Sequence, residues 1–180
     1  MRIITAPEPL DIKDDEIAVF LAGGITDCPD WQKEVIGAFN MVMKSYPKLV
    51  LLNPRRANFP IDDPNAAMEQ ITWEFNALER TDIFSMYFCS GISDQPICMY
   101  ELGRNIVRMQ MRFPADWEKR IIITQEQGYR RFADVRIQTV LATEGLIEPV
   151  NVSPSSGCAT HSLNIRNAYK KVKRRQRGTN

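Results

Sequence analysis

The sequence has almost no net charge and no long apolar run. Its 23 basic and 22 acidic residues give a net charge of +1, so the whole molecule has no strong electrostatic attraction to nucleic acid or to an anionic membrane. No apolar stretch approaches the roughly 20 residues that span a bilayer, and residues 1–16 carry acids and prolines where a secretory signal is apolar. We therefore expect a cytoplasmic protein with no membrane partner.

Motifs for metal binding and redox chemistry are also scarce. The cysteines are Cys28, Cys89, Cys98 and Cys158, and the absence of a C-x-x-C pair suits reduced thiols in a reducing compartment. Cys158 and His161 make a single C-x-x-H without a second ligand pair, so we predict no metal site. The dinucleotide motif G-x-G-x-x-G and internal repeats are absent as well, and we predict no cofactor.

The chain contains instead a regular alternation of apolar strands and amphipathic helices. The expected strands cover residues 17–22, 49–52, 83–89 and 120–124, and the expected helices begin near residues 31, 65, 97 and 129. This order predicts a single-domain α/β fold. We expect a parallel sheet of four to five strands with helices on both faces, in a flavodoxin-like or Rossmann-like arrangement.

The two ends of the chain lack these patterns. Residues 1–16 carry prolines and an acidic cluster, and we expect an irregular lead-in. With 180 residues and 44% hydrophobic content the chain has material for one domain, which we place at residues 1–150. Residues 151–180 are polar and basic, and we expect this C-terminal tail to be poorly packed or to rest on a partner subunit.

One glutamate precedes the most apolar strand, residues 83–89. In the helix before that strand, Met68, Ile71, Phe75 and Leu78 recur at the spacing of one helical face. At about 100° per residue, Glu74 falls on the edge of this face. We therefore expect a half-buried carboxylate at this position.

A second glutamate follows the same strand. In the next helix Cys98, Leu102, Asn105 and Met109 form the inward stripe, and Glu101 lies on its flank. The loop before this helix, residues 90–96, lies at the carboxyl end of the strand, where open α/β sheets bind ligands. A carboxylate there can attack an electrophilic sugar carbon, while a second carboxyl group handles the proton of the leaving group. The alternative is a pair of solvated or ion-paired helix acids.

Three segments resemble the nucleoside 2-deoxyribosyltransferases and their nucleotide N-hydrolase relatives. Residues 20–25 (FLAGGI) are similar to the family's first strand and glycine turn, and residues 73–83 (WEFNALERTDI) to its acid-bearing helix. Residues 99–103 (MYELG) are similar to its nucleophile motif. The resemblance covers residues 20–107 and implies the same fold. It also implies that Glu101 is the nucleophile and that Glu74 takes the place of an aspartate that contacts the base.

The chain departs from the family near the nucleophile. The family often has an aspartate six residues before it, where this chain has Gln95, with Asp94 adjacent. We expect Gln95 to contact the substrate. The resemblance then leaves either Glu74 or Asp94 to protonate the base as it leaves.

Further candidates for substrate contact lie just after the first predicted strand. Gly23 and Gly24 lack a Cβ, so that a ligand or a neighbouring helix can approach the backbone closely. Trp31 begins the following helix and is placed either to cover a sugar or base or to pack in the core. The glycine pair and the tryptophan together predict a binding surface beside the first strand.

Polar residues also follow the second predicted strand. Asn53, Arg55 and Arg56 come directly after it, at the expected binding edge of the sheet. The guanidinium groups suit a phosphate or a ribose hydroxyl, and they equally suit ion pairs with nearby surface acids. We predict substrate contacts for Asn53 and Arg55.

The resemblance implies an enzyme that cleaves the N-glycosidic bond of (deoxy)nucleosides or nucleotides through a glycosyl-glutamate, in nucleotide salvage. The sugar passes to another base or to water. One alternative is a deoxynucleoside 5′-monophosphate hydrolase, although Ile97 stands where a serine would bind phosphate and no arginine follows Gly24. The other is a non-catalytic module that binds a nucleotide, or that binds nucleic acid through the basic tail. The resemblance also implies a homo-oligomer.

Overall fold

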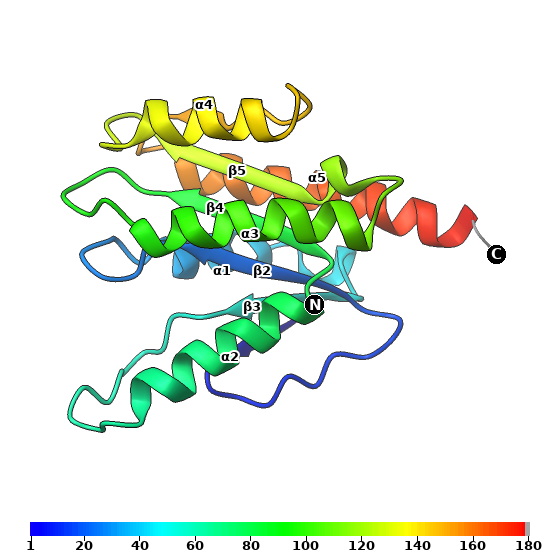
Figure 1. The fold of residues 1–180 in the computed structure, drawn as a ribbon. Helices are drawn as coiled ribbons and strands as arrows, with labels where there is room; N and C mark the ends of the chain where they lie inside the picture. Colours follow the sequence, from blue (N-terminus) through cyan, green and yellow to red (C-terminus); the bar gives the residue numbers. More distant parts are fainter. Residues whose placement is uncertain (179–180) are drawn as a thin grey trace.

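The computed structural model describes residues 1–178 and contains one six-stranded sheet in the order β1-β3-β2-β4-β5-β6 (Figure 1). All neighbouring strands are parallel. The strands are β1 (Arg2–Thr5), β2 (Ile17–Gly23), β3 (Leu49–Asn53), β4 (Ile83–Phe88), β5 (Ile121–Glu126) and β6 (Val150–Val152). Apart from the added edge strand β1, this is the flavodoxin-like order, which confirms the predicted α/β fold.

Helices cover both faces of the sheet, as the parallel strands require (Figure 1). The helices are α1 (Trp31–Asn40), α2 (Ala66–Arg80), α3 (Pro96–Arg112), α4 (Phe132–Ala142) and α5 (Gly157–Gly178), with 3-10 turns at Met43–Ser45 and Trp117–Lys119. One core cluster joins α2, α3 and α4 to the sheet, and the other joins α1 and α5 to the opposite face. None of the helices within residues 1–178 is long and apolar enough to cross a membrane.

Strand β4 lies in the middle of the sheet and is buried along its whole length. Its residues alternate between the two core clusters, with Phe84 and Met86 on the α3 side and Ile83 and Tyr87 on the α1 side. This alternation explains why the sequence shows a continuous apolar run here.

The predicted inner face of α2 is wrong except at Leu78, which is buried. Met68, Ile71 and Phe75 are exposed, with fractional exposures of 71%, 64% and 49%, while Trp73 and Ala77 are buried. The helix has two apolar stripes, and the stripe around Trp73 packs on Phe20, whose ring centroid lies 6.4 Å from that of the indole. The stripe that contains Trp73 therefore faces the sheet.

Both ends of the chain are more ordered than predicted. Strand β1 replaces part of the expected lead-in, and β6 pairs with β5, so the sheet has six strands rather than four to five. Helix α5 buries Ile165, Ala168, Tyr169 and Val172 against the sheet. The expectation of a poorly packed tail is therefore wrong for β6 and for this face of α5. Charged residues dominate the composition of α5, and Lys170, Lys171 and Arg174 are exposed on its other faces.

The chain's single histidine, His161, fixes α5 to the sheet. Its Nε2 lies 2.7 Å from the hydroxyl oxygen of Ser85 on β4, and its Nδ1 lies 2.8 Å from that of Thr124 on β5. The imidazole packs edge-on against the rings of Trp31 and Tyr87. Complete burial lowers the pKa of His161 to about 3, so the ring is neutral under physiological conditions.

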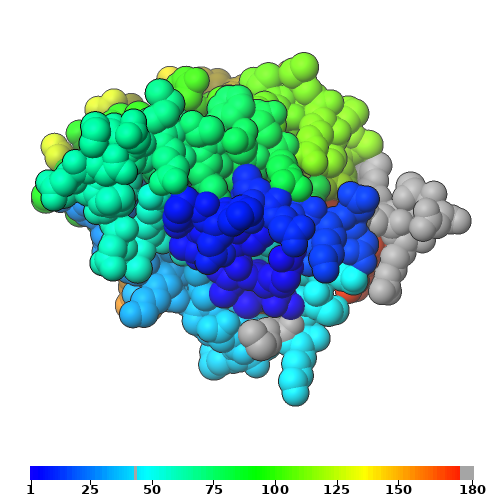
Figure 2. Space-filling view, turned by 90° about the horizontal axis from the view of Figure 1, so that it is seen from below, coloured from blue at the N-terminus to red at the C-terminus, as the bar shows by residue number. Residues whose placement is uncertain are grey.

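The loop that follows β1 lies against α2 along one side of the molecule (Figure 2). The indole nitrogen of Trp73 donates to the carbonyl oxygen of Glu8 at 2.7 Å, and Arg80 donates to the carbonyl oxygens of Leu10 and Ile12. These bonds satisfy loop carbonyls that no strand pairs. They attach the N-terminal segment to the helix that carries Glu74.

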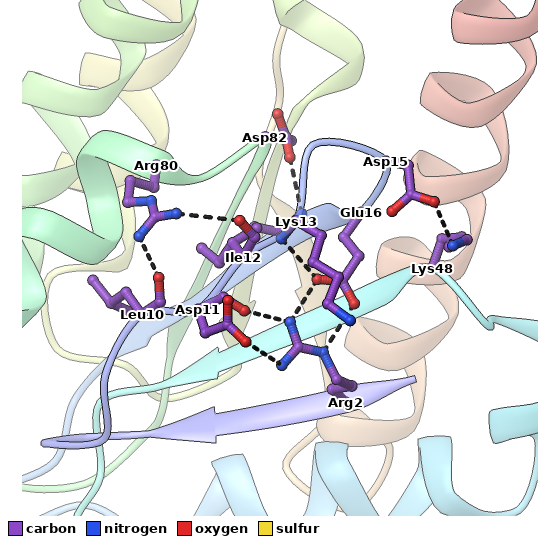
Figure 3. A network of polar contacts seen from close by, with 11 residues as sticks. Arg2, Leu10, Asp11, Ile12, Lys13, Asp15, Glu16, Lys48, Arg80 and Asp82 are labelled. Carbon is purple, nitrogen blue, oxygen red and sulfur yellow. Dashed lines mark hydrogen bonds and ion pairs between the residues drawn. The ribbon is translucent and has the colours of Figure 1, made fainter.

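A network of charged residues lies at the amino ends of the strands (Figure 3). Arg2 donates through Nε to Glu16 at 2.9 Å and through Nη2 at 2.5 Å, and Glu16 also accepts from the backbone of Lys13. The carboxylate of Asp82 accepts from the backbone of Ala18 at 2.9 Å. These contacts lie at the amino ends of the strands, opposite the edge where a ligand is expected.

Candidate active site

A cavity of about 220 Å³ lies at the carboxyl ends of β2 and β4. The chain leaves β2 toward β3 on one side and reaches β4 on the other, so the cavity occupies the topological switch point of the sheet. Its lining comprises Phe20, Ala22, Gly23, Gly24, Ile25, Thr26, Pro54, Glu74, Ser93, Gln95, Pro96, Ile97, Cys98 and Glu101. The fold therefore brings both predicted acids to one space.

The glycine turn after β2 forms one wall of the cavity. A Cβ on Gly23, at φ +153°, would lie 2.3 Å from the carbonyl oxygen of Tyr87 and 2.6 Å from the Trp31 ring. A Cβ on Gly24 would lie 2.4 Å from the sulfur of Cys28. Both positions therefore need glycine because neighbouring protein atoms, rather than a ligand, leave no room for a Cβ.

Gln95 connects the two loops that form the cavity. Its Oε1 accepts from the backbone of Gly24 at 3.2 Å, and its Nε2 donates to the carbonyl oxygen of Cys89 at 2.9 Å. The residue caps α3 in a left-handed conformation (φ 49°) and is buried. Gln95 therefore lines the cavity while its amide holds the glycine turn in place.

Three other predicted contact residues lie outside the cavity lining and have structural partners. Trp31 is buried behind the glycine turn, stacks on Tyr87 at 4.9 Å between ring centroids and donates to the carbonyl oxygen of Gly24. Asn53 forms a local turn with the backbone of Arg55. The Nη2 of Arg55 donates to the carbonyl oxygens of Gly24 and of the turn that follows it, at 2.9 to 3.4 Å. These contacts support a structural role for Arg55.

Asp94 also lies outside the cavity lining. Its side chain is half exposed, and one carboxylate oxygen lies 3.6 Å from Nε of Arg130. Its backbone carbonyl accepts from the hydroxyl of Tyr129 at 2.9 Å. Of the two acids considered for protonating the leaving base, only Glu74 lines the cavity.

A chain of hydrogen bonds supports the carboxylate of Glu74. Arg56, which is 7% exposed, donates through Nε to Oε1 of Gln70 at 2.6 Å. The Nε2 of Gln70 donates to Oε1 of Glu74 and to the carbonyl oxygen of Pro54, each at 2.7 Å. Burial raises the pKa of Glu74, and the Gln70 bond and the positive charge of Arg56 oppose that rise.

Glu101 has a less favourable environment for its charge. Within residues 1–178 its carboxylate accepts no hydrogen bond, although Asn105 donates to its backbone oxygen at 2.8 Å. Burial, followed by the negative charge of Glu74, raises the pKa of Glu101 to about 7, and Arg104 acts in the opposite direction. Such a carboxyl group changes its ionisation near neutral pH, which is common at catalytic sites.

A comparison with known protein families gives a match. A family model described as nucleoside 2-deoxyribosyltransferase like matches residues 16–123. The matched range is more than half of the 180 residues and contains Glu74, Gln95 and Glu101. The chain belongs to the nucleoside 2-deoxyribosyltransferase-like family. No curated protein matches the chain.

In this member of the nucleoside 2-deoxyribosyltransferase-like family, the sequence did not reveal every residue that forms the cavity or supports its acids. Gln70 was missed, although it precedes Glu74 by one helical turn, the spacing at which side chains on a helix meet. Thr26, Ser93 and Cys98 also line the cavity, and no local pattern distinguishes them from ordinary loop or core residues. No group of three His, Cys, Asp or Glu side chains within residues 1–178 is arranged to hold a metal ion.

Proposed function

We propose that the protein cleaves the N-glycosidic bond of a (deoxy)nucleoside with Glu101 as the nucleophile. The observation that carries this proposal is the presence of Glu101 and Glu74 in one cavity at the switch point of a deoxyribosyltransferase-like fold. Most enzymes that break a glycosidic bond use a pair of carboxyl groups. The sugar then passes to another base or to water.

In the first step a carboxylate oxygen of Glu101 attacks C1′ of the sugar. The C1′–N bond breaks, its electron pair stays on the base, and a glycosyl ester of Glu101 forms. A neutral base also needs a proton, which the carboxyl pair supplies through Glu74. In the second step an incoming base or water attacks C1′ and releases the Glu101 carboxylate, so the sugar retains its configuration.

The charges around the cavity favour a nucleoside over a 5′-monophosphate. No Lys, Arg or His is among the residues that line the cavity in the described part of the chain. Arg55 is bonded to loop carbonyls, and Arg56 to Gln70 and Glu69. A phosphate dianion would therefore meet two acids without a free guanidinium group. This arrangement argues against the monophosphate hydrolase.

A 2-fluoro-arabino nucleoside tests the proposed nucleophile. Fluorine slows both steps and lets the glycosyl ester accumulate, because it destabilises the oxocarbenium-like transition states. We expect the added sugar on the tryptic peptide of residues 81–104, at Glu101 in tandem mass spectrometry. Glu101→Gln should remove labelling and lower kcat by at least about 1,000-fold.

Glu148→Gln is the matched control, because Glu148 is an exposed acid paired with Arg136 away from the cavity. It should label and turn over like the wild type. Labelling of the Glu101→Gln protein, or retention of its activity, would show that another group is the nucleophile. Offering a second free base in the same assay distinguishes transfer from hydrolysis.

A further inference from the structure

The hydrogen bonds around the cavity stabilise the ionised form of only one of its two carboxyl groups. Gln70 donates to Glu74 at 2.7 Å and is itself held by Arg56 at 2.6 Å, so the hydrogen bonds favour the charged form of Glu74. Within residues 1–178 the Glu101 carboxylate receives no such bond. When the pair binds one proton, that proton therefore lies mainly on Glu101 and leaves Glu74 ionised.

This location of the shared proton is unfavourable for the release of a neutral base. Such a base needs a proton from Glu74 while Glu101 is ionised, which is the minor arrangement of the singly protonated pair. A base that already carries a positive charge needs no proton, because it becomes neutral when the C1′–N bond breaks. For this kind of substrate the fully ionised pair is the reactive form.

The surrounding charges also favour a cation. Helix α2 contributes Glu74 and α3 contributes Glu101, while the residues from the loops after β2 and β4 that line the cavity are uncharged. The nearby Arg104 donates to Glu79 at 2.8 Å and lies 4.4 Å over the Phe75 ring, and Arg56 is held by Glu69 and Gln70. A bound cation would provide the positive charge that the lining lacks.

Building on the proposed function, we propose that this cavity acts on N-glycosides of permanently cationic heterocycles, the class that includes pyridinium ribosides and N7-alkylated purine nucleosides. A Glu101 oxygen bonds to C1′, the C1′–N bond breaks, and its electron pair neutralises the ring nitrogen. Water then attacks C1′ and regenerates the carboxylate. One cationic nucleoside and one water thus give a neutral base, a free sugar and one proton.

The test compares two 2′-deoxyribosides of six-membered rings, nicotinamide 2′-deoxyriboside as the cation and 2′-deoxycytidine as the neutral substrate. The quantity measured is kcat/KM between pH 5 and 9, after subtraction of spontaneous hydrolysis. For the cation we expect a rise through about pH 7 and then a plateau. For deoxycytidine we expect a decline above pH 7, so the ratio should grow about tenfold per pH unit.

Glu74→Gln adds a second measurement, with Glu148→Gln as the control. Removing the charge of Glu74 should raise KM for the cation about tenfold with little change in its kcat. For deoxycytidine the same variant should lower kcat instead, because the shared proton is lost. Glu148→Gln should leave all four constants near their wild-type values.

A ratio that is independent of pH, or a preference for deoxycytidine at pH 8, would overturn the proposal. The fluoro-nucleoside label separates this failure from that of the proposed function. If Glu101 is labelled and deoxycytidine is cleaved but the cation is not, only the substrate class is wrong. If Glu101 is not labelled and neither substrate is cleaved, both proposals are wrong.

Discussion

At the scale of single residues, Gln70 links the cavity to the loop after β3. Its amide bonds at once to Glu74, to Arg56 and to the backbone of Pro54. The residue titrates at no pH, and its amide donates to Oε1 of Glu74 at 2.7 Å. An amide suits this place because it accepts from the guanidinium group and donates to the carboxylate.

We predict that Gln70→Met raises the pKa of Glu74. Methionine has a similar length but cannot donate, so the carboxylate loses a charge-assisted hydrogen bond of about 1.5–3 kcal/mol. A carbon-13 NMR titration of the glutamate carboxyl groups measures the change without reference to activity. Gln138→Met is the matched control, since Gln138 lies on α4 outside this cavity. An unchanged Glu74 titration would show that the Gln70 bond is absent in solution.

The sequence predicted some single residues better than others. Glu101 could be placed because helical spacing puts it on the flank of the buried stripe of α3. Glu74 lines the cavity as expected, although most of the α2 face from which it was placed is exposed. Arg55 and Trp31 could not be assigned in the same way. Arg55 bonds to carbonyl groups of the glycine turn and Trp31 stacks on Tyr87 of β4, so both depend on contacts between segments far apart in sequence.

At the scale of elements, α5 depends on a narrow apolar face. Tyr169 and Val172 are buried in the α1-side cluster, and the ring of Tyr169 packs edge-on against Tyr46 at 5.4 Å between centroids. The hydroxyl of Tyr169 is buried and has no hydrogen-bond partner within residues 1–178. The ring therefore supplies the stabilisation in this contact, and the hydroxyl does not add to it.

We predict that Tyr169→Ala lowers the free energy of unfolding by about 3–5 kcal/mol, because it leaves a cavity between α5 and the sheet. Tyr169→Phe is the matched control and should preserve or slightly raise stability, since it removes only an unpaired hydroxyl. Urea denaturation measures both. If Tyr169→Ala loses less than about 1 kcal/mol, the packing of α5 on the sheet contributes little.

The central elements were easier to predict than those at the edges. The strands β2, β3 and β4 and the first half of β5 are largely apolar because helices cover the sheet on both faces. The edge strands β1 and β6 are short, and their burial is incomplete. Helix α5 was missed because its lysines and arginines outnumber the few apolar residues that pack.

At the scale of the whole molecule, two groups of acids make stability depend on pH in opposite directions. The hydrogen bond from Arg2 lowers the pKa of Glu16, and the resulting stability is present above the unfolded pKa and is lost as pH falls. Burial raises the pKa values of Glu74, Asp82 and Glu101. The stability that these three acids contribute is present below their unfolded pKa values and is lost as pH rises through their folded pKa values. For Glu101 the folded pKa is about 7.

We predict that the melting temperature is highest near pH 5 and declines toward pH 8. In Glu101→Gln the decline should shrink, with a gain at pH 8 on the order of 2 kcal/mol or roughly 5 °C and almost no gain at pH 4.5. Scanning calorimetry across this range provides the measurement. Glu148→Gln should decline like the wild type. A parallel decline in Glu101→Gln would mean that its carboxyl group is well solvated.

The position of His161 makes the protein unusually convenient for spectroscopy. The chain has one histidine, and both of its ring nitrogens are bonded to hydroxyl groups of the central strands beneath α5. The imidazole stays neutral across the working pH range, so its resonances do not drift with buffer. In a proton NMR spectrum, the two ring C–H signals of His161 therefore report whether α5 is packed on the sheet, in the intact protein and without an introduced label.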